Sequence, residues 1–164
     1  MASGSWLAPR AAGRSIFPTE KDKPPELKAR ALRYLARREH SRDELARKLA
    51  PYAESPEVLE GLLRELESKK QLSNERFADG RAHWLARKYG AARIRKDLQA
   101  KGVEEALVER VSAEGDLQLA KQILAKKYRE PATTREERAR RSRFLQSRGF
   151  SYDTIRAVVA DVDE

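Results

Sequence analysis

Two short stretches decide how this chain folds: LQAKGV at residues 98–103 and LQSRGF at residues 145–150. Leucine, glutamine, a cation and glycine match in register, and the last residue of each stretch is apolar. Glycine just after a helical run is typical of a helix end, because glycine readily adopts the left-handed conformation found there. We therefore interpret the two stretches, which lie 47 residues apart, as the end of the same helix in two copies of one structural unit.

Apolar residues at helical spacing extend outward from these stretches and define a first unit. The spacing predicts a helix over about 26–38 and a second that begins at Ser41, with Glu44 completing a capping box. A third helix begins where Ser55 precedes Pro56. The stretch KLAPYA at 48–53 stands where the other units have their glycine motifs.

The remaining units repeat this order. In the second unit Asn74 is the expected cap of a helix with Phe77 and Trp84 on its apolar face. In the third unit Thr134 and Glu137 form another capping box. The sequence thus predicts an all-α fold, a tandem array of three three-helix repeats that is elongated and slightly curved. Repeats of this kind bury apolar faces against their neighbours, and we expect the same here.

The expected limits of these units follow from the same pattern. Residues 1–25 contain four prolines and no sustained period, which is typical of a flexible N-terminal tail. The repeats are expected over 26–72, 73–113 and 114–164.

The composition narrows the classes of function. The net charge is +9 with a pI of about 9.9, and the excess is spread along the repeats, which favours polyanions or an acidic protein surface as partners. There is no cysteine, which excludes disulfides and thiolate chemistry. No apolar run approaches the ~20 residues of a membrane span. We expect a cytoplasmic protein with no membrane contact, and a monomer, because no large apolar stripe is left over.

No group of residues indicates catalysis. The sequence lacks nucleophile-elbow, P-loop and dinucleotide-binding motifs. His83 lies four residues after Asp79, but two ligands without a third make a poor metal site. His40 is interpreted as a solvated residue at a helix end. We expect no enzyme, no cofactor and no metal.

Basic residues cluster on or beside the second helix of each unit, which predicts a basic strip along the array that could contact phosphates. The candidates are Arg37, Arg38, Arg42, Arg47, Lys48, Lys88, Arg93, Arg95, Lys96, Lys101, Arg138, Arg140, Arg141, Arg143 and Arg148.

An alternative hypothesis comes from residues 41–72, which resemble the helix-turn-helix of winged-helix transcription factors. Such a protein would be a sequence-specific DNA-binding regulator. Against this, APYAES at 50–55 is longer than the usual turn of three or four residues. NERFADGRAHW at 74–84 also shows helical spacing and not the alternation of a wing strand.

Four stretches together resemble the RecX regulatory proteins of bacteria: ALRYLARREHSRDELARKL (31–49), LSNERFADG (72–80), KYGAARIRKDLQAKGV (88–103) and RFLQSRGFSYDTI (143–155). The family commonly has glycine near Lys70–Gln71 and aspartate near Asn74, departures that we interpret as ordinary turn variations. The resemblance implies a three-helix tandem-repeat fold. It also implies a noncatalytic regulator that binds the RecA–DNA nucleoprotein filament, with single- and double-stranded DNA, and inhibits recombinase, ATPase and coprotease activity in recombination and the SOS response.

Overall fold

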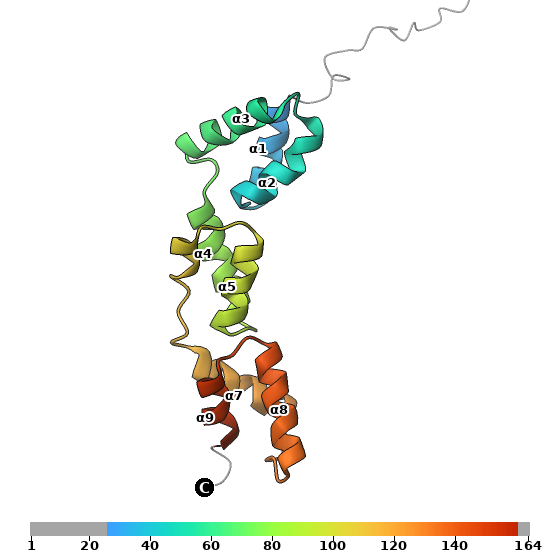
Figure 1. Ribbon diagram of the computed structural model, residues 1–164, viewed down its shortest axis with the longest axis vertical. Coiled ribbons are helices and arrows are strands. Elements are labelled where there is room, and N and C mark those ends of the chain that lie inside the picture. The colour runs from blue at the N-terminus through green and yellow to red at the C-terminus, as the bar shows by residue number, and fades with distance from the viewer. Residues whose placement is uncertain (1–25, 161–164) are drawn as a thin grey trace, which may run out of the picture.

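The structure is a computed structural model that describes residues 26–160, so the tail expected over 1–25 lies outside the described residues. Within this range the chain forms nine α-helices, one 3-10 helix and no strand, which confirms the all-α fold. None of these helices is both long and apolar enough to cross a membrane. The helices form three successive groups along the long axis of the molecule, which confirms an elongated array (Figure 1).

Each group contains a first, a second and a third helix. The bounds are α1 (Leu27–Arg37), α2 (Arg42–Leu49), η1 (Ala50–Tyr52) and α3 (Pro56–Ser68) in the first group; α4 (Asn74–Leu85), α5 (Ala91–Ala100) and α6 (Glu105–Val108) in the second; α7 (Asp116–Lys127), α8 (Arg135–Ser147) and α9 (Tyr152–Ala160) in the third. The boundaries that we expect between the units, after residues 25, 72 and 113, remain predictions.

Every group has a hydrophobic core of its own. Leu49 in the first group, Leu98 in the second and Leu145 in the third are 0% exposed, and each lies at the end of the second helix. The buried residues around them form three clusters, each confined to one group. The expectation that apolar faces are buried between neighbouring repeats is therefore wrong in the main: each three-helix group closes its own core, and largely polar contacts join the groups.

Short polar side chains begin most of these helices, as expected. Thr134 and Glu137 form the complete capping box of α8. Ser41 accepts a hydrogen bond from the Glu44 amide, but the Glu44 side chain pairs with Arg38, so this box is only half formed. The cap of α4 is Ser73 and not Asn74, because the Ser73 side chain accepts from the amide of Arg76. Asn74 is thereby free for a different contact.

Three helices end in the same motif, with a left-handed residue one position past the cap. Gly102 has φ +73° and Gly149 has φ +84°, which confirms both as helix-stop residues. At the end of α3 the same position belongs to Lys70, with φ 57°. In each case the amide of the following residue donates to the carbonyl five residues back, as Val103 does to Leu98 (3.1 Å). Lys70 is thus a strained substitute for glycine and not an ordinary turn variation.

Two side chains lie where the sequence pattern did not place them. His40 is buried, with 1% of its surface exposed, so its interpretation as a solvated cap is wrong. Trp84 was placed on the apolar face of α4, but it is 54% exposed. The α4 helix turns Phe77 and Leu85 into the core and leaves the indole at the surface.

Candidate functional site

The second helices of the three groups follow one another head to tail. The C-terminal end of α8 meets the N-terminal end of α5, and the C-terminal end of α5 meets the N-terminal end of α2 (Figure 1). The negative end of one helix dipole therefore faces the positive end of the next, which is a favourable arrangement. We name these three helices, α2, α5 and α8, the central column.

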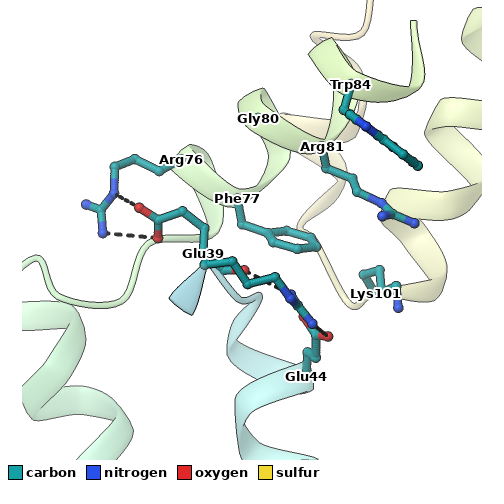
Figure 2. Close-up of a pocket in the computed structure, with 9 residues that line it drawn as sticks. Glu39, Glu44, Arg76, Phe77, Gly80, Arg81, Trp84 and Lys101 are labelled. Carbon is teal, nitrogen blue, oxygen red and sulfur yellow. Dashed lines mark hydrogen bonds and ion pairs between the residues drawn. The ribbon is translucent and has the colours of Figure 1, made fainter. Parts of the chain in front are cut away.

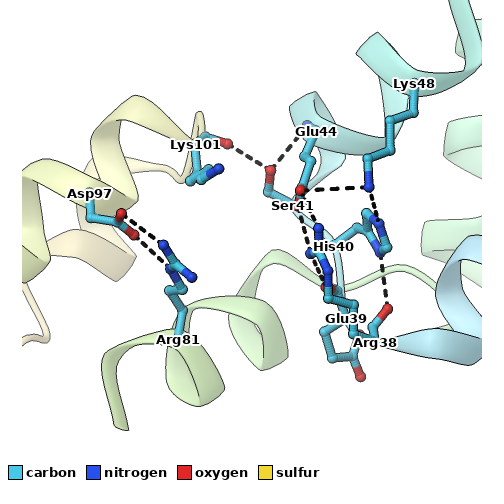
Figure 3. A network of polar contacts seen from close by, with 9 residues as sticks. All are labelled: Arg38, Glu39, His40, Ser41, Glu44, Lys48, Arg81, Asp97 and Lys101. Atoms are coloured by element: carbon cyan, nitrogen blue, oxygen red, sulfur yellow. Dashed lines mark hydrogen bonds and ion pairs between the residues drawn. The ribbon is translucent and has the colours of Figure 1, made fainter. Parts of the chain in front are cut away.

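The residue before each glycine joins one group to the next. The Lys101 carbonyl accepts from the Ser41 hydroxyl (2.7 Å), the N-cap of α2. The Arg148 carbonyl accepts from the amide of Gly90 (2.8 Å), the N-cap of α5. Figure 3 shows the first of these contacts beside the ion pair between Arg81 and Asp97. The glycine motifs therefore not only stop their helices but also dock them on the preceding group.

A second contact also repeats at both junctions between groups. We call the contact region between the first and second groups the first junction and that between the second and third groups the second junction. The Asn74 side chain, at the first residue of α4, accepts from the amide of Arg42 (2.8 Å), the first residue of α2. The carboxylate of Asp116, the first residue of α7, accepts from the amide of Ala91 (3.0 Å), the first residue of α5. Sequence reasoning missed this pair, because Asn74 and Asp116 are not 47 residues apart and no local pattern relates them.

The glycines also permit close approach. A Cβ atom built on Gly149 would lie 2.6 Å from the backbone nitrogen of Arg93, and one on Gly102 would lie 2.8 Å from the Cβ atom of Asp43. Both distances are too short for real atoms, so each junction requires glycine for space as well as for its left-handed backbone. The two obstacles differ, because one is backbone and the other is a side chain.

Eight of the fifteen basic candidates make contacts within the chain. They are Arg38, Arg42, Lys48, Arg93, Arg95, Arg138, Arg141 and Arg148. Arg93, for example, donates to the carbonyl of Ser147 across the second junction (2.8 Å) and lies 4.4 Å from the centre of the Tyr89 ring. These side chains help to build the array, and part of their charge is already neutralised or satisfied.

The other seven candidates have no side-chain partner within residues 26–160. They are Arg37, Arg47, Lys88, Lys96, Lys101, Arg140 and Arg143. Lys101 is half-buried and the other six are exposed. Arg47, Lys96 and Arg143 also occupy equivalent positions, each two residues before the fully buried leucine that ends its helix. We name these three residues the cation ladder, since each group contributes one of them at the same position of the central column and none has a side-chain partner within residues 26–160.

The helices of the central column become more basic along the chain. The α2 helix has three cations against two acids, α5 has three against one, and α8 has five arginines against two glutamates. The α3 helix has the opposite character, with four glutamates against one arginine. Polyanions are therefore attracted to the central column and repelled by α3.

Ionisable groups beside the first junction have shifted pKa values. The hydrogen bond from Arg38 holds the pKa of Glu44 at about 2. Burial lowers the pKa of His40, whose Nδ1 lies 3.0 Å from the Arg38 carbonyl and whose Nε2 lies 2.9 Å from the Lys48 ammonium (Figure 3). A neutral imidazole with its proton on Nδ1 satisfies both contacts, because Nε2 can then accept from Lys48. This network orders the start of α2.

No group of three His, Asp or Glu side chains in residues 26–160 is arranged to hold a metal ion. His83 and Asp79 are both exposed on α4.

Models of one protein family match all three groups. Residues 28–66, 73–111 and 114–159 match the first, second and third three-helix domains of RecX. The chain is 46% identical over 136 residues to the regulatory protein RecX of Herbaspirillum seropedicae, covering 81% of this chain and 88% of that protein. It is 42% identical over 144 residues to that of Ralstonia pickettii (strain 12J), covering 86% and 91%.

The fold also matches a solved structure. The crystal structure of RecX from Lactobacillus salivarius superposes with a TM-score of 0.73 at 19% identity, covering 84% of this chain and 94% of that one. At that identity the likeness concerns the fold.

Proposed function

This chain belongs to the RecX family of regulatory proteins, and we propose that it is a noncatalytic regulator that binds the RecA–DNA nucleoprotein filament and inhibits its recombinase, ATPase and coprotease activities. The observation that carries the proposal is the match of all three groups to RecX domains. An elongated array suits a repetitive partner, because several weak contacts made at once add to a strong one.

The cation ladder is the surface that we assign to the phosphates of the filament. Arg47, Lys96 and Arg143 are exposed, unpaired within the described residues and repeated once per group. Arg140 lies three residues before Arg143, one helical turn away, and is also exposed. Cations that are already bonded within the chain, such as Arg42 with Glu60 and Glu67, are less available to a partner.

The first test measures ATP hydrolysis by RecA on single-stranded DNA with increasing amounts of this protein. We expect hydrolysis to slow at substoichiometric ratios. Unchanged hydrolysis at an equimolar ratio contradicts the proposal.

The second test reverses the charge of Arg47, Lys96, Arg140 and Arg143 to glutamate. Filament binding, measured by co-sedimentation, should weaken at least tenfold. The slope of log affinity against log salt should become shallower by about 3, since each lost contact with single-stranded phosphate removes about 0.7.

The matched control reverses four exposed cations outside the central column, Arg33, Arg87, Lys126 and Arg156, for the same change in net charge. Equal weakening by both sets contradicts the assignment of the ladder and leaves only a general effect of charge.

The helix-turn-helix alternative is disfavoured on two observations. The third helix of the first group, which would enter the major groove, is the acidic α3. Residues 26–160 also contain no strand that could form a wing. A preference for one duplex sequence in a binding selection would restore that alternative.

A further inference from the structure

A surface pocket of about 430 Å³ lies between the first and second groups (Figure 2). Phe77, Gly80, Arg81 and Trp84 line it from α4, while Arg38 and Lys101 come from the neighbouring segments. The pocket combines an exposed aromatic ring with several cations. None of the three residues of the cation ladder lines it.

Trp84 is held as an exposed platform. Its indole is 54% exposed and borders the pocket. The Arg81 guanidinium lies 5.5 Å from the ring centre and is fixed by two hydrogen bonds to Asp97, at 2.8 and 3.0 Å. Gly80, one turn earlier on α4, leaves the space beside it empty, because nothing lies within 4 Å of a Cβ atom built there. A flat ring could therefore approach the indole.

The charged residues around Trp84 favour an anionic ligand. Both glutamates that line the pocket are engaged, Glu39 by Arg76 at 2.7 Å and Glu44 by Arg38 at 2.5 Å. Lys101 is different, because no carboxylate of residues 26–160 pairs with its ammonium group. Among the residues that the structure describes, the pocket thus places an unpaired cation beside an exposed aromatic ring, which fits a ligand with one anionic group and one flat ring.

We propose that this pocket binds one nucleotide of single-stranded DNA, with the base stacked on Trp84 and the phosphate paired with Lys101. The assignment rests on the proposed function, because it brings the pocket into contact with a DNA strand. An acidic peptide fits less well, since it gains from Lys101 but gives the indole no ring to stack on. Base stacking on an aromatic side chain also accepts any sequence, as a regulator of filaments requires.

The experiment uses the fluorescence of Trp84 as the probe. The sequence contains two tryptophans, Trp6 and Trp84, so the substitution Trp6→Phe leaves Trp84 as the only one. A thymidine oligonucleotide should quench this fluorescence, and an acidic peptide of equal length should not. Quenching by the peptide and not by the oligonucleotide overturns the proposal in favour of a peptide site.

Variants then measure the contribution of each contact to oligonucleotide affinity. Trp84→Ala should weaken binding by about 5- to 140-fold, the range measured for one stacked base. Trp84→Phe should retain most of the affinity, and Lys101→Met should make the salt slope shallower by about 0.7. Tyr152→Ala, at an aromatic residue that is 75% exposed in another group, is the control and should change nothing.

Gly80→Gln separates binding from folding. Glutamine is a better helix former than glycine, so α4 should be no less stable, while its side chain fills the space beside Trp84. Wild-type oligonucleotide affinity in both Trp84→Ala and Gly80→Gln overturns the proposed pocket. The proposed function would survive that result if both variants still inhibit RecA; it would fail separately if the wild-type protein had no effect on RecA.

Discussion

The two junction glycines should respond differently to the same substitution, Gly→Ala. Both have left-handed backbones, where an alanine costs about 1 to 2 kcal/mol. The added methyl group also overpacks the junction, which costs about 1 to 3 kcal/mol when the neighbours cannot move. At Gly149 the obstacles are the backbone nitrogen of Arg93 at 2.6 Å and its Cα at 2.9 Å, together with its Cβ. Gly149→Ala should therefore lower the free energy of unfolding by about 2 to 5 kcal/mol.

At Gly102 the three nearest obstacles all belong to the side chain of Asp43. Removal of the Asp43 carboxylate should relieve most of the clash, because the two nearest of these three atoms disappear and the Cβ atom at 2.8 Å is the one that stays. In a double-mutant cycle measured by urea unfolding, Asp43→Ala should recover about 1 kcal/mol or more of the loss caused by Gly102→Ala. Arg93→Ala should recover less than about 0.5 kcal/mol of the loss caused by Gly149→Ala, since alanine keeps all three obstructing atoms.

Gly115→Ala is the control, because Gly115 has a right-handed backbone and open space around it. Because Gly115 is the N-cap of α7, where glycine is preferred over alanine, the substitution should lower the free energy of unfolding by about 0.5 to 1 kcal/mol, well below the loss expected at Gly149. Equal recovery by Asp43→Ala and Arg93→Ala would refute the reasoning that the two junctions are obstructed by different kinds of atom.

Three further predictions concern the helix ends and junctions. Lys70→Gly should raise the free energy of unfolding by about 1 kcal/mol in urea titrations, because it relieves a left-handed backbone at an exposed lysine; a loss would contradict the strain. Burial raises the pKa of Asp116 above its ordinary 3.8, so the buried charge lowers stability at neutral pH. Asp116→Asn should therefore stabilise the protein at pH 7 and lose that advantage as the pH falls through the raised pKa; a destabilised variant at pH 7 would show that the charge is needed. The pKa of Glu44 is lowered from 4.5 to about 2, so its pairing with Arg38 should be fully present above pH 4.5 and be lost as the pH falls towards 2. Acid unfolding of Glu44→Gln should show a smaller fall over that window, and identical curves would refute the contribution.

The sequence predicted those helix ends that depend only on residues adjacent in the chain. Glycine at 102 and 149 ends a helix wherever the surrounding chain lies, so spacing and residue type were sufficient. Adjacent capping residues are harder, because Ser73 and Asn74 can both accept from the amides of a first turn. Ser73 is the N-cap of α4, because the Asn74 side chain instead accepts from the amide of Arg42 in another group. That contact depends on tertiary placement and has no sequence signal.

The sequence predicted the candidate site only as a set of basic residues. Helical position placed basic residues on the second helix of each group, but it could not separate Arg42, held by Glu60 and Glu67, from Arg47, which has no partner within residues 26–160. Exposure of Trp84 was missed for a related reason. The apolar spacing on α4 is weak, so the side of the helix that meets the core depends on where α5 and α6 pack.

Within residues 26–160, the contacts that join one group to the next have no counterpart at the two outer ends of the central column, the end of α2 and the start of α8. The α2 helix runs into η1, which contains Pro51, and ends without the left-handed glycine that follows α5 and α8. At the other end the Glu137 carboxylate accepts from the amides of Thr133 and Thr134, and the Thr134 hydroxyl accepts from the amide of Glu137. The start of α8 therefore caps itself, whereas α5 receives its contacts from the next group.

A second chain consequently finds neither a matching docking motif on α2 nor open donors on α8. We predict that the protein does not associate head to tail and that light scattering gives the mass of one chain, 18.7 kDa, at every concentration. A mass that rises with concentration, and that falls again when Gly149 is replaced by alanine, would show instead that the junction geometry also operates between molecules.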